Sequence, residues 1–343
     1  MKKILFAASI FAFTVSVSSQ NTTDTAVNYA ASITAKELGN HLFTYASDEF
    51  EGRDTGEPGQ KMAVEYLKNF YVSQRIISPI GGDDYYQEVP AAYMNKLSRR
   101  GQIKDSENVL AYIKGSEKPD EVIVISAHLD HVGMNKDGEV FNGADDDGSG
   151  TVAILEIAEA FKKAVADGNG PKRSILFLHV TGEEKGLLGS KYYTENPIFP
   201  LANTIANLNI DMIGRIDVRH KGNPKYIYLI GSDKLSTELH EVSEAVNKKY
   251  MNIELDYKYN DENDPNRFYY RSDHYNFAKN NVPIIFYFNG THVDYHKETD
   301  TPDKINYEQL ENRTRLVFYT AWEVANREGT IVADKVEKVE KTE

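Results

Sequence analysis

The chain has 343 residues, of which 41% are hydrophobic, and it carries a formal net charge of −13 at pH 7. This length and apolar content suit one large α/β domain, or at most two domains, and exclude disorder for most of the chain. The negative charge argues against nucleic acid as a partner. The sequence contains no Cys, which excludes disulfide bonds and thiol chemistry.

The N-terminus has the three parts of a secretory signal peptide. Two lysines precede an apolar run over residues 4–17, and the small residues Ser18 and Ser19 follow it. We therefore expect residues 1–19 to be a signal peptide and the mature protein to be periplasmic or extracellular. The apolar run is shorter than the ~20 residues of a membrane-spanning helix, so we expect no membrane span.

From residue 60 onward, helical and strand-like patterns alternate without repeats. Apolar residues at helical spacing, or in β-branched runs, predict the elements. We expect helices at residues 60–74, 151–165, 235–250 and 307–325, and strands at residues 122–125, 175–178, 205–210, 226–230 and 284–288. This order predicts one domain, over residues 20–327, with a three-layer α/β/α fold and a mixed, mostly parallel central sheet. Residues 328–343 are rich in charged side chains, and we expect a frayed, charged C-terminal tail.

Histidine and carboxylate side chains follow the first three predicted strands. His128 and Asp130 follow the first strand, Glu183 and Glu184 the second, and Asp211 the third. In open α/β sheets, ligands bind in the crevice beyond the carboxyl ends of the strands. We therefore expect these imidazole and carboxylate groups to converge there, as a pair of metal ions would require.

A run of three aspartates, Asp145 to Asp147, precedes the predicted helix at residues 151–165. Two interpretations are open. The carboxylates could bridge two cations, which would relieve their mutual repulsion, or they could form an exposed acidic turn that supports the helix N-terminus. The strand-end donors, together with His296 further along the chain, favour the metal site.

The adjacent carboxylates Glu183 and Glu184 could divide the work of a hydrolase. One can bind a cation while its neighbour holds a water as general base. Standing alone, the pair would be interpreted as ordinary loop carboxylates. Asp130, two residues after His128, could orient that imidazole through its second ring nitrogen.

Seven motifs, in this order, resemble the M28 zinc aminopeptidases over most of the chain, from about Ser47 to Lys304. No single motif decides the resemblance, because only the ordered set is specific. The motifs are SDEFEGR at residues 47–53, AHLDHVG at 127–133, NGADDDGSG at 142–150, TGEEKGLLGS at 181–190, NIDMIGR at 209–215, RSDH at 271–274 and DYH at 294–296.

The resemblance implies a zinc-exopeptidase fold, of the phosphorylase/hydrolase-like type, with two zinc ions. It makes His128 and Asp211 ligands of one zinc, Glu184 and His296 ligands of the other, and Asp146 a bridge between them. Of the three consecutive aspartates, the family pattern thus selects the middle one. It also implies that the peptide bond after Asp146 is cis.

The implied reaction removes the N-terminal residue from a peptide with a free N-terminus. A water that bridges the two zinc ions would attack the peptide bond, with Glu183 as the general base, while Asp130 orients His128. The oxyanion needs a further donor, and Tyr295, next to His296, is our candidate. The alternative is an ordinary packed Tyr in a chain that contains 22 of them.

Recognition of the substrate is less specified by the sequence. The free amine needs an anionic partner, and Glu183 and Asp211 are candidates. We expect the pocket walls to come from Tyr-rich loops at residues 222–226 and 257–270. These loops favour an apolar N-terminal side chain.

Three other functions stay open. A glutaminyl cyclase would resemble this fold but use a single zinc, and the aspartate run and the GLLGS sequence at residues 186–190 favour the peptidases instead. A carboxypeptidase-type relative that binds acidic peptides would need a basic cluster, for which Arg215 and Arg271 are candidates. A non-catalytic binding protein would have lost its metal ligands, whereas every expected ligand is present.

The other histidines have less ligand-like surroundings. His131 is interpreted as a structural or orienting residue near the cleft, and His179 as a histidine of the core. His274 is left open between a structural role and a border of the substrate pocket. The remaining four have no ligand-like context in the sequence: His41, His220, His240 and His292.

Overall fold

The computed structural model describes residues 22–98 and 101–336. The predicted signal peptide and residues 337–343 lie outside these described residues. Within them, no helix is both long enough and apolar enough to cross a membrane.

One mixed sheet of eight strands forms the centre of the described chain, in the order β1-β2-β4-β3-β5-β8-β6-β7. The inner strands β4, β3, β5 and β8 run parallel to one another, β7 runs parallel to β6, and the other neighbours are antiparallel. This confirms the predicted α/β fold with a mixed, mostly parallel sheet. The strands are β1 (Tyr86–Val89), β2 (Ser106–Ile113), β3 (Lys118–His128), β4 (Arg173–Val180), β5 (Thr204–Ile210), β6 (Tyr226–Ile230), β7 (Glu254–Asp256) and β8 (Ile284–Phe288).

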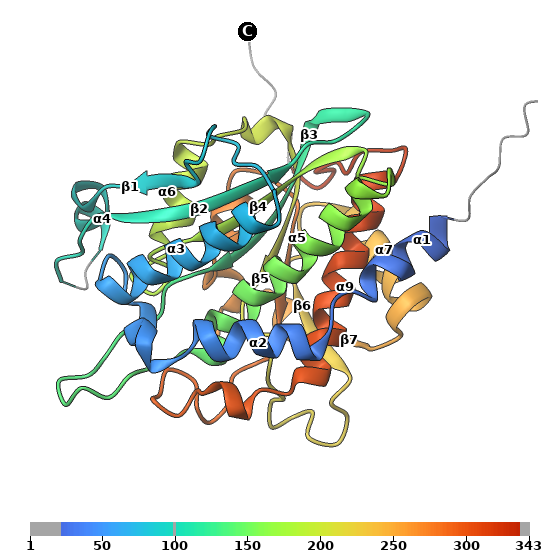
Figure 1. Ribbon diagram of the computed structural model, residues 1–343. Coiled ribbons are helices and arrows are strands. Elements are labelled where there is room, and N and C mark those ends of the chain that lie inside the picture. Colours follow the sequence, from blue (N-terminus) through green and yellow to red (C-terminus); the bar gives the residue numbers. More distant parts are fainter. Residues whose placement is uncertain (1–21, 99–100, 337–343) are drawn as a thin grey trace, which may run out of the picture.

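Helices cover both faces of the sheet (Figure 1). Helices α3, α5 and α9 contact one face, and α6 and α8 contact the other. The described helices are α1 (Thr22–Ala30), α2 (Ala35–Tyr45), α3 (Pro58–Ser73), α4 (Ala91–Leu97), α5 (Gly150–Ala166), α6 (Leu188–Glu195), α7 (Thr237–Val246), α8 (His274–Ala278) and α9 (Tyr307–Asn326).

The apolar run of β3 shows why the sheet is covered on both sides. Successive side chains of a strand point to opposite faces. Ile123 accordingly packs into the core beneath α5 and α9, while Val124 packs into a second core with Tyr193 of α6 and Phe277 of α8. A strand that is buried on both faces needs an unbroken apolar run rather than an alternating one, which is the pattern that predicted it.

The predicted helices and strands are all present, most of them longer than their sequence patterns. Residues 235–250 are an exception, because α7 ends at Val246 and a wider helical turn follows at Asn247–Met251. The Oγ atom of Ser236 accepts a hydrogen bond from the backbone N–H of Leu239 and fixes the start of α7. The sequence patterns missed the helices α1, α2, α4, α6 and α8 and the strands β1, β2 and β7. Most of these elements are short, and the edge strand β1 has only four residues, too few for a periodic signal.

The described part of the predicted tail packs against the domain instead of fraying. The buried guanidinium of Arg173 donates to the backbone carbonyls of Arg327 and Gly329. Ile331 is buried, and a carboxylate oxygen of Asp334 accepts from the N–H of Thr237. A buried Arg with several carbonyl partners fixes this segment, which its charged composition does not indicate.

Candidate metal centre

Three neighbouring strands bring the predicted donors to one edge of the sheet. β4, β3 and β5 are adjacent and parallel, so their carboxyl ends meet at the same edge. His128 is the last residue of β3, Glu183 and Glu184 follow β4, and Asp211 follows β5. The convergence predicted from the sequence is therefore present.

Asp146 lies between two histidines. Its Oδ1 atom is 3.1 Å from Nε2 of His128, and its Oδ2 atom is 3.0 Å from Nε2 of His296. Asp146 belongs to the segment Ala144–Ser149 that leads into α5, whereas His296 follows β8. Burial raises the pKa of Asp146, but the imidazoles of His128 and His296 beside its oxygens outweigh burial and hold that pKa well below its usual value. The carboxylate is therefore ionised and offers one oxygen to each histidine.

Two further carboxylates complete one group of donors on each side of Asp146. On the first side, Oδ1 of Asp211 lies 3.7 Å from Nε2 of His128. On the second side, Oε1 of Glu184 lies 3.1 Å from Nε2 of His296. Ligands bound at ~2.1 Å to a tetrahedral zinc ion lie roughly 3.4 Å apart. The spacing of both groups therefore fits zinc.

Buried polar atoms in both groups point to the same conclusion. Nε2 of His128 and Oδ2 of Asp146 are buried, and neither makes a well-oriented hydrogen bond. Nearly all buried polar atoms in proteins have such a partner. A cation between these atoms would satisfy them, and imidazole with carboxylate is a donor set that zinc prefers.

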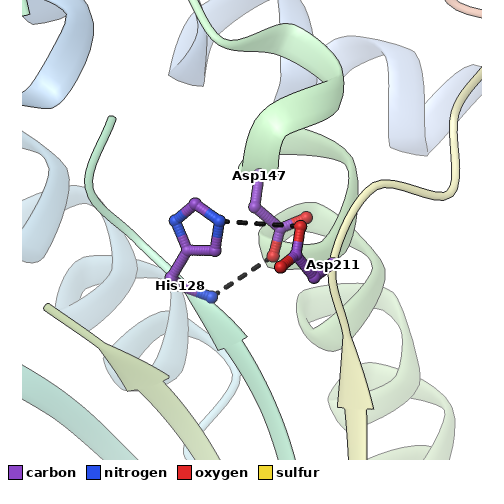
Figure 2. A group of neighbouring side chains, drawn as sticks. All are labelled: His128, Asp147 and Asp211. Carbon is purple, nitrogen blue, oxygen red and sulfur yellow. Dashed lines mark hydrogen bonds and ion pairs between the residues drawn. The ribbon is translucent and has the colours of Figure 1, made fainter. Parts of the chain in front are cut away.

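The aspartate on the C-terminal side of Asp146 serves the backbone. Oδ1 of Asp147 accepts from the N–H groups of Gly150 and Met212, and Oδ2 accepts from the N–H of His128. Figure 2 shows the imidazole of His128 facing Asp211 while the backbone nitrogen of His128 faces Asp147. Asp147 is close enough to join that group, but its oxygens are already engaged. The peptide bond between Asp146 and Asp147 is cis, as the resemblance implies.

The aspartate on the N-terminal side is also engaged elsewhere. Oδ1 of Asp145 accepts from the N–H of Gly214, and Oδ2 lies 3.1 Å from Nε2 of His292. The carboxylate of Asp300 accepts from the N–H groups of Asp145 and Asp146. The middle aspartate is thus the one whose side chain faces both groups of donors. His292, which has no ligand-like context in the sequence, helps to fix this segment.

Asp130 connects His128 to Glu183. The Nδ1 atom of His128 lies 2.9 Å from the backbone oxygen of Asp130, whereas the nearer carboxylate oxygen lies 3.9 Å away. The carboxylate accepts instead from the N–H of Glu183 and from the hydroxyl of Thr55. Asp130 therefore contacts His128 through its carbonyl group and holds the backbone of Glu183 through its side chain.

Glu183 lines the pocket beside both groups of donors. Its side chain is half-buried. Burial raises the pKa of Glu183 well above its usual value, and the negative charges of Glu184 and Asp211 add to this effect. Such surroundings suit a carboxylate that takes up a proton during a reaction.

Tyr295 lies at the same pocket. Its ring stacks on that of His296, with 3.9 Å between the centroids, and its hydroxyl accepts a long, 3.5 Å hydrogen bond from Arg271. Burial and the charges of Asp146 and Glu184 raise the pKa of Tyr295, so the hydroxyl keeps its proton. The structure thus brings Tyr295 to the donors, as expected from its place in the sequence.

Aromatic side chains form one wall of this pocket. Phe286 and Phe288 come from β8, Phe268 comes from the loop at residues 257–270, and Met212 follows Asp211. No lining residue comes from the loop at residues 222–226, although the sequence had suggested that loop. The two phenylalanines of β8 look like ordinary strand residues in the sequence, so nothing marked them as pocket walls.

The motif at residues 47–53 holds two loops of the centre together. Its last residue, Arg53, is fully buried and donates to the backbone carbonyls of Leu129, Asn142 and Gly143. These carbonyls belong to the loops that carry His131 and the aspartate run. Sequence reasoning gave Arg53 no role, because a lone Arg is usually a surface residue.

The remaining histidines differ from one another. His179 lies in the core with Nε2 2.7 Å from the hydroxyl of Tyr71, as predicted, and the buried His274 contacts the carbonyl of Tyr269 and does not line the pocket. His220 lies beside two carboxylates in a separate group of potential ligands, which its sequence context did not indicate. The carboxylates of that group belong to Glu254 and Asp256.

An α/β sheet whose strand ends gather two adjoining groups of histidines and carboxylates defines a candidate two-metal centre. The chain belongs to peptidase family M28, whose family model matches residues 108–321. That match includes the whole aspartate run and all the strand-end donors.

Two curated relatives cover different shares of the chain. It is 31% identical over 143 residues to the probable glutamate carboxypeptidase LAMP1 of Arabidopsis thaliana, a match that covers 41% of this chain and 20% of the relative. It is 25% identical over 308 residues to leupeptin-inactivating enzyme 1 of Streptomyces exfoliatus, which covers 82% of this chain and 59% of the relative. The chain therefore spans less than two thirds of the length of either relative.

Solved structures of two different activities share the fold. The Legionella pneumophila LapA aminopeptidase matches with a TM-score of 0.67 and 20% identity, over 96% of this chain and 81% of that chain. The Porphyromonas gingivalis glutaminyl cyclase matches with a TM-score of 0.65 and 18% identity, over 84% of this chain and 97% of that chain. At these identities the likeness shows the fold, and the reaction must be argued from the site.

Proposed function

We propose that this protein is an exported aminopeptidase that depends on two zinc ions. The observation that carries the proposal is the position of Asp146, whose two carboxylate oxygens face two separate groups of donors. A single-metal site needs no such bridge, whereas a carboxylate can hold two cations together by offering one oxygen to each.

The residues divide between the two ions as the family pattern implies. His128 and Asp211 would hold one zinc, Glu184 and His296 would hold the other, and Asp146 would contact both. Bound zinc supplies Lewis acidity for the peptide carbonyl and lowers the pKa of a water at the site.

Two pocket residues would handle the proton and the developing charge. Glu183, held through its backbone by Asp130, would accept a proton from the attacking water and deliver it to the departing amine. The hydroxyl of Tyr295 would donate a hydrogen bond to the oxygen that becomes negative. Its ring is fixed against His296, so this donor is held next to the second group of ligands.

The pocket also supports a choice of substrate. Glu183 and Asp211 both line it and provide negative charge for the free amine of a peptide. Phe268, Phe286 and Phe288 form its apolar wall. We therefore propose that the enzyme prefers a large apolar residue at the N-terminus of its substrate.

The carboxypeptidase alternative is less well supported by the pocket. Recognition of an acidic peptide would require several free cations. Arg215 lies 2.6 Å from Asp294 and 3.6 Å from Asp300, so its charge is already paired, and it does not line the pocket. Among the lining residues, Arg271 is the only Arg or Lys side chain.

Aminoacyl arylamides test the proposal directly. The purified mature chain should release the arylamine from an unblocked leucyl arylamide and leave the N-acetylated form intact. Equal rates on both substrates would overturn the aminopeptidase assignment. A peptide with an N-terminal glutamine distinguishes the aminopeptidase from a glutaminyl cyclase. A cyclase would release ammonia from this peptide and leave all of its residues joined, whereas an aminopeptidase would release the N-terminal residue.

We also propose export, which rests on the signal-like N-terminus. The protein recovered from the periplasm or the medium should lack residues 1–19, as measured by mass spectrometry of the intact chain. Recovery of the uncleaved chain from the cytoplasm alone would contradict this proposal.

A further inference from the structure

His131 stands apart from the ligand set that the resemblance implies, yet its ring lies within the centre. It follows β3 by three residues, and its backbone N–H donates to the carbonyl of Arg53. The side chain is fully buried. A histidine that is buried beside acidic metal ligands needs an explanation for both of its ring nitrogens.

The donor group formed by Asp146, Glu184 and His296 explains the position of this ring. Nδ1 of His131 lies 3.3 Å from Oε1 of Glu184 and 3.9 Å from Oδ2 of Asp146. The same two oxygens lie 3.1 Å and 3.0 Å from Nε2 of His296. Both imidazoles therefore face one pair of carboxylate oxygens, at spacings close to those of ligands around one zinc ion.

The ring of His131 lacks any other polar partner. Neither ring nitrogen makes a well-oriented hydrogen bond, although both are buried. A buried polar atom without a partner is costly, and an ordinary structural histidine, such as His179 with Tyr71, avoids that cost through a hydrogen bond.

The backbone is also shaped to admit this ring. Gly143 has a φ of +54°, and a Cβ atom at this position would lie 2.5 Å from Cγ of His131. A side chain at residue 143 would therefore push the imidazole out of its place. The glycine allows the ring to lie against the segment that carries Asp146.

We propose that His131 is a fourth protein ligand of the zinc ion held by Asp146, Glu184 and His296. The inference rests on the proposed function, since it concerns the same pair of ions. It makes the two sites unequal, with four protein ligands on this side and three on the side of His128. Zinc sites with four protein ligands are typically closed, whereas a site with three keeps a position open. The ion on the His131 side should therefore bind more tightly, and the other should offer the open position.

Competition with a zinc chelator measures this inequality. Wild-type protein loaded with zinc should release its two ions at clearly different chelator concentrations. His131→Phe keeps a ring in place and removes both nitrogens. Loss of a residue that merely orients a ligand costs about 10- to 100-fold in metal affinity, so this variant should weaken the tighter site by at least about 10-fold. The matched control is His179→Phe, which removes another buried imidazole and should leave both affinities unchanged.

X-ray absorption at the zinc edge gives an answer that does not depend on the folding of a variant. Wild-type protein loaded with one equivalent of zinc should show two imidazoles bound to the ion, from His131 and His296. A single imidazole would overturn the inference, and so would equal affinities in His131→Phe and the wild type.

The two proposals fail in different ways. If the zinc ion has the ligands inferred here but no unblocked arylamide is hydrolysed, the aminopeptidase assignment is wrong and the role of His131 stands. If the enzyme hydrolyses arylamides with two zinc ions and His131→Phe holds both as tightly as the wild type, only the inference about His131 is wrong.

Discussion

The Oδ2 atom of Asp146 lies 3.0 Å from Nε2 of His296. Its other carboxylate oxygen faces His128, so the side chain of Asp146 joins the two groups. Replacing it by Asn takes one negative charge away from both groups at once, because an amide offers a single neutral oxygen. Asp146→Asn should therefore lose most of both zinc ions, as measured by elemental analysis of the purified protein.

The matched variant is Asp211→Asn, which alters the His128 group alone. It should lose about one zinc per chain and retain the other. Loss of the same amount of zinc from both variants would contradict the bridging position of Asp146.

Glu183→Gln separates catalysis from metal binding. The variant keeps the size of the side chain and cannot accept a proton, and its backbone can still donate to Asp130. We expect kcat to fall by roughly 10²- to 10⁴-fold while the zinc content stays at the wild-type value. Hydrolysis of a leucyl arylamide measures the first quantity and elemental analysis the second. Glu184→Gln should instead lose zinc, and a fully active Glu183→Gln would refute the assignment of the base.

Tyr295→Phe tests the oxyanion donor. The phenyl ring can still stack on His296, so the change removes the hydroxyl and little else. Loss of one oxyanion donor typically lowers kcat by about 10²- to 10³-fold, and we expect an effect of that order with a nearly unchanged KM. A steady-state comparison with the wild type checks both parameters. If kcat stayed at the wild-type level, Tyr295 would be a packing residue of the pocket.

The buried Glu156 on α5 should make the stability of the fold depend on pH, independently of the metal centre. Burial raises its pKa to about 8, and the charges of Glu37 and Glu159 add to this. The folded state therefore holds a proton that the unfolded state releases from its ordinary pKa of 4.5 upward. Stability from this group is complete below pH 4.5 and is lost as the pH rises toward 8.

Glu156→Gln removes the titration. As the pH rises from 5 to 8.5, the free energy of unfolding of the variant should increase relative to that of the wild type, on the order of a few kcal/mol. Thermal unfolding at those two pH values measures the gain, and Glu49→Gln on the surface controls for the loss of a charge. An equal difference in Tm at both pH values would show that Glu156 carries no such shift.

The sequence predicts the strands of the centre because their runs are unbroken and β-branched. β3 and β4 are buried on both faces, so no polar residue interrupts Val122 to Ile125 or Ile175 to Leu178. Because these runs identify the strands, the histidine and carboxylate residues that follow them could be placed at the carboxyl edge of the sheet. The resemblance to a known family then assigned them their roles.

Other parts of the centre depend on contacts between segments far apart in the chain. The side chain of Asp130 holds Glu183, and its carbonyl contacts His128; a two-residue spacing does not distinguish these arrangements. The ring of His131 points at Glu184 because of the shape of the loop and the space beside Gly143. The sequence does not reveal the aromatic wall from β8 either. This strand is buried on both faces, so its apolar run does not show which face meets the pocket.

Zinc titration of the metal-free enzyme tests the central claim most directly. The protein stripped by a chelator should hydrolyse no leucyl arylamide, and activity should return as zinc is added and reach its maximum at two equivalents per chain. Full activity of the stripped protein, or a maximum at one equivalent, would contradict a mechanism that needs two ions bridged by Asp146.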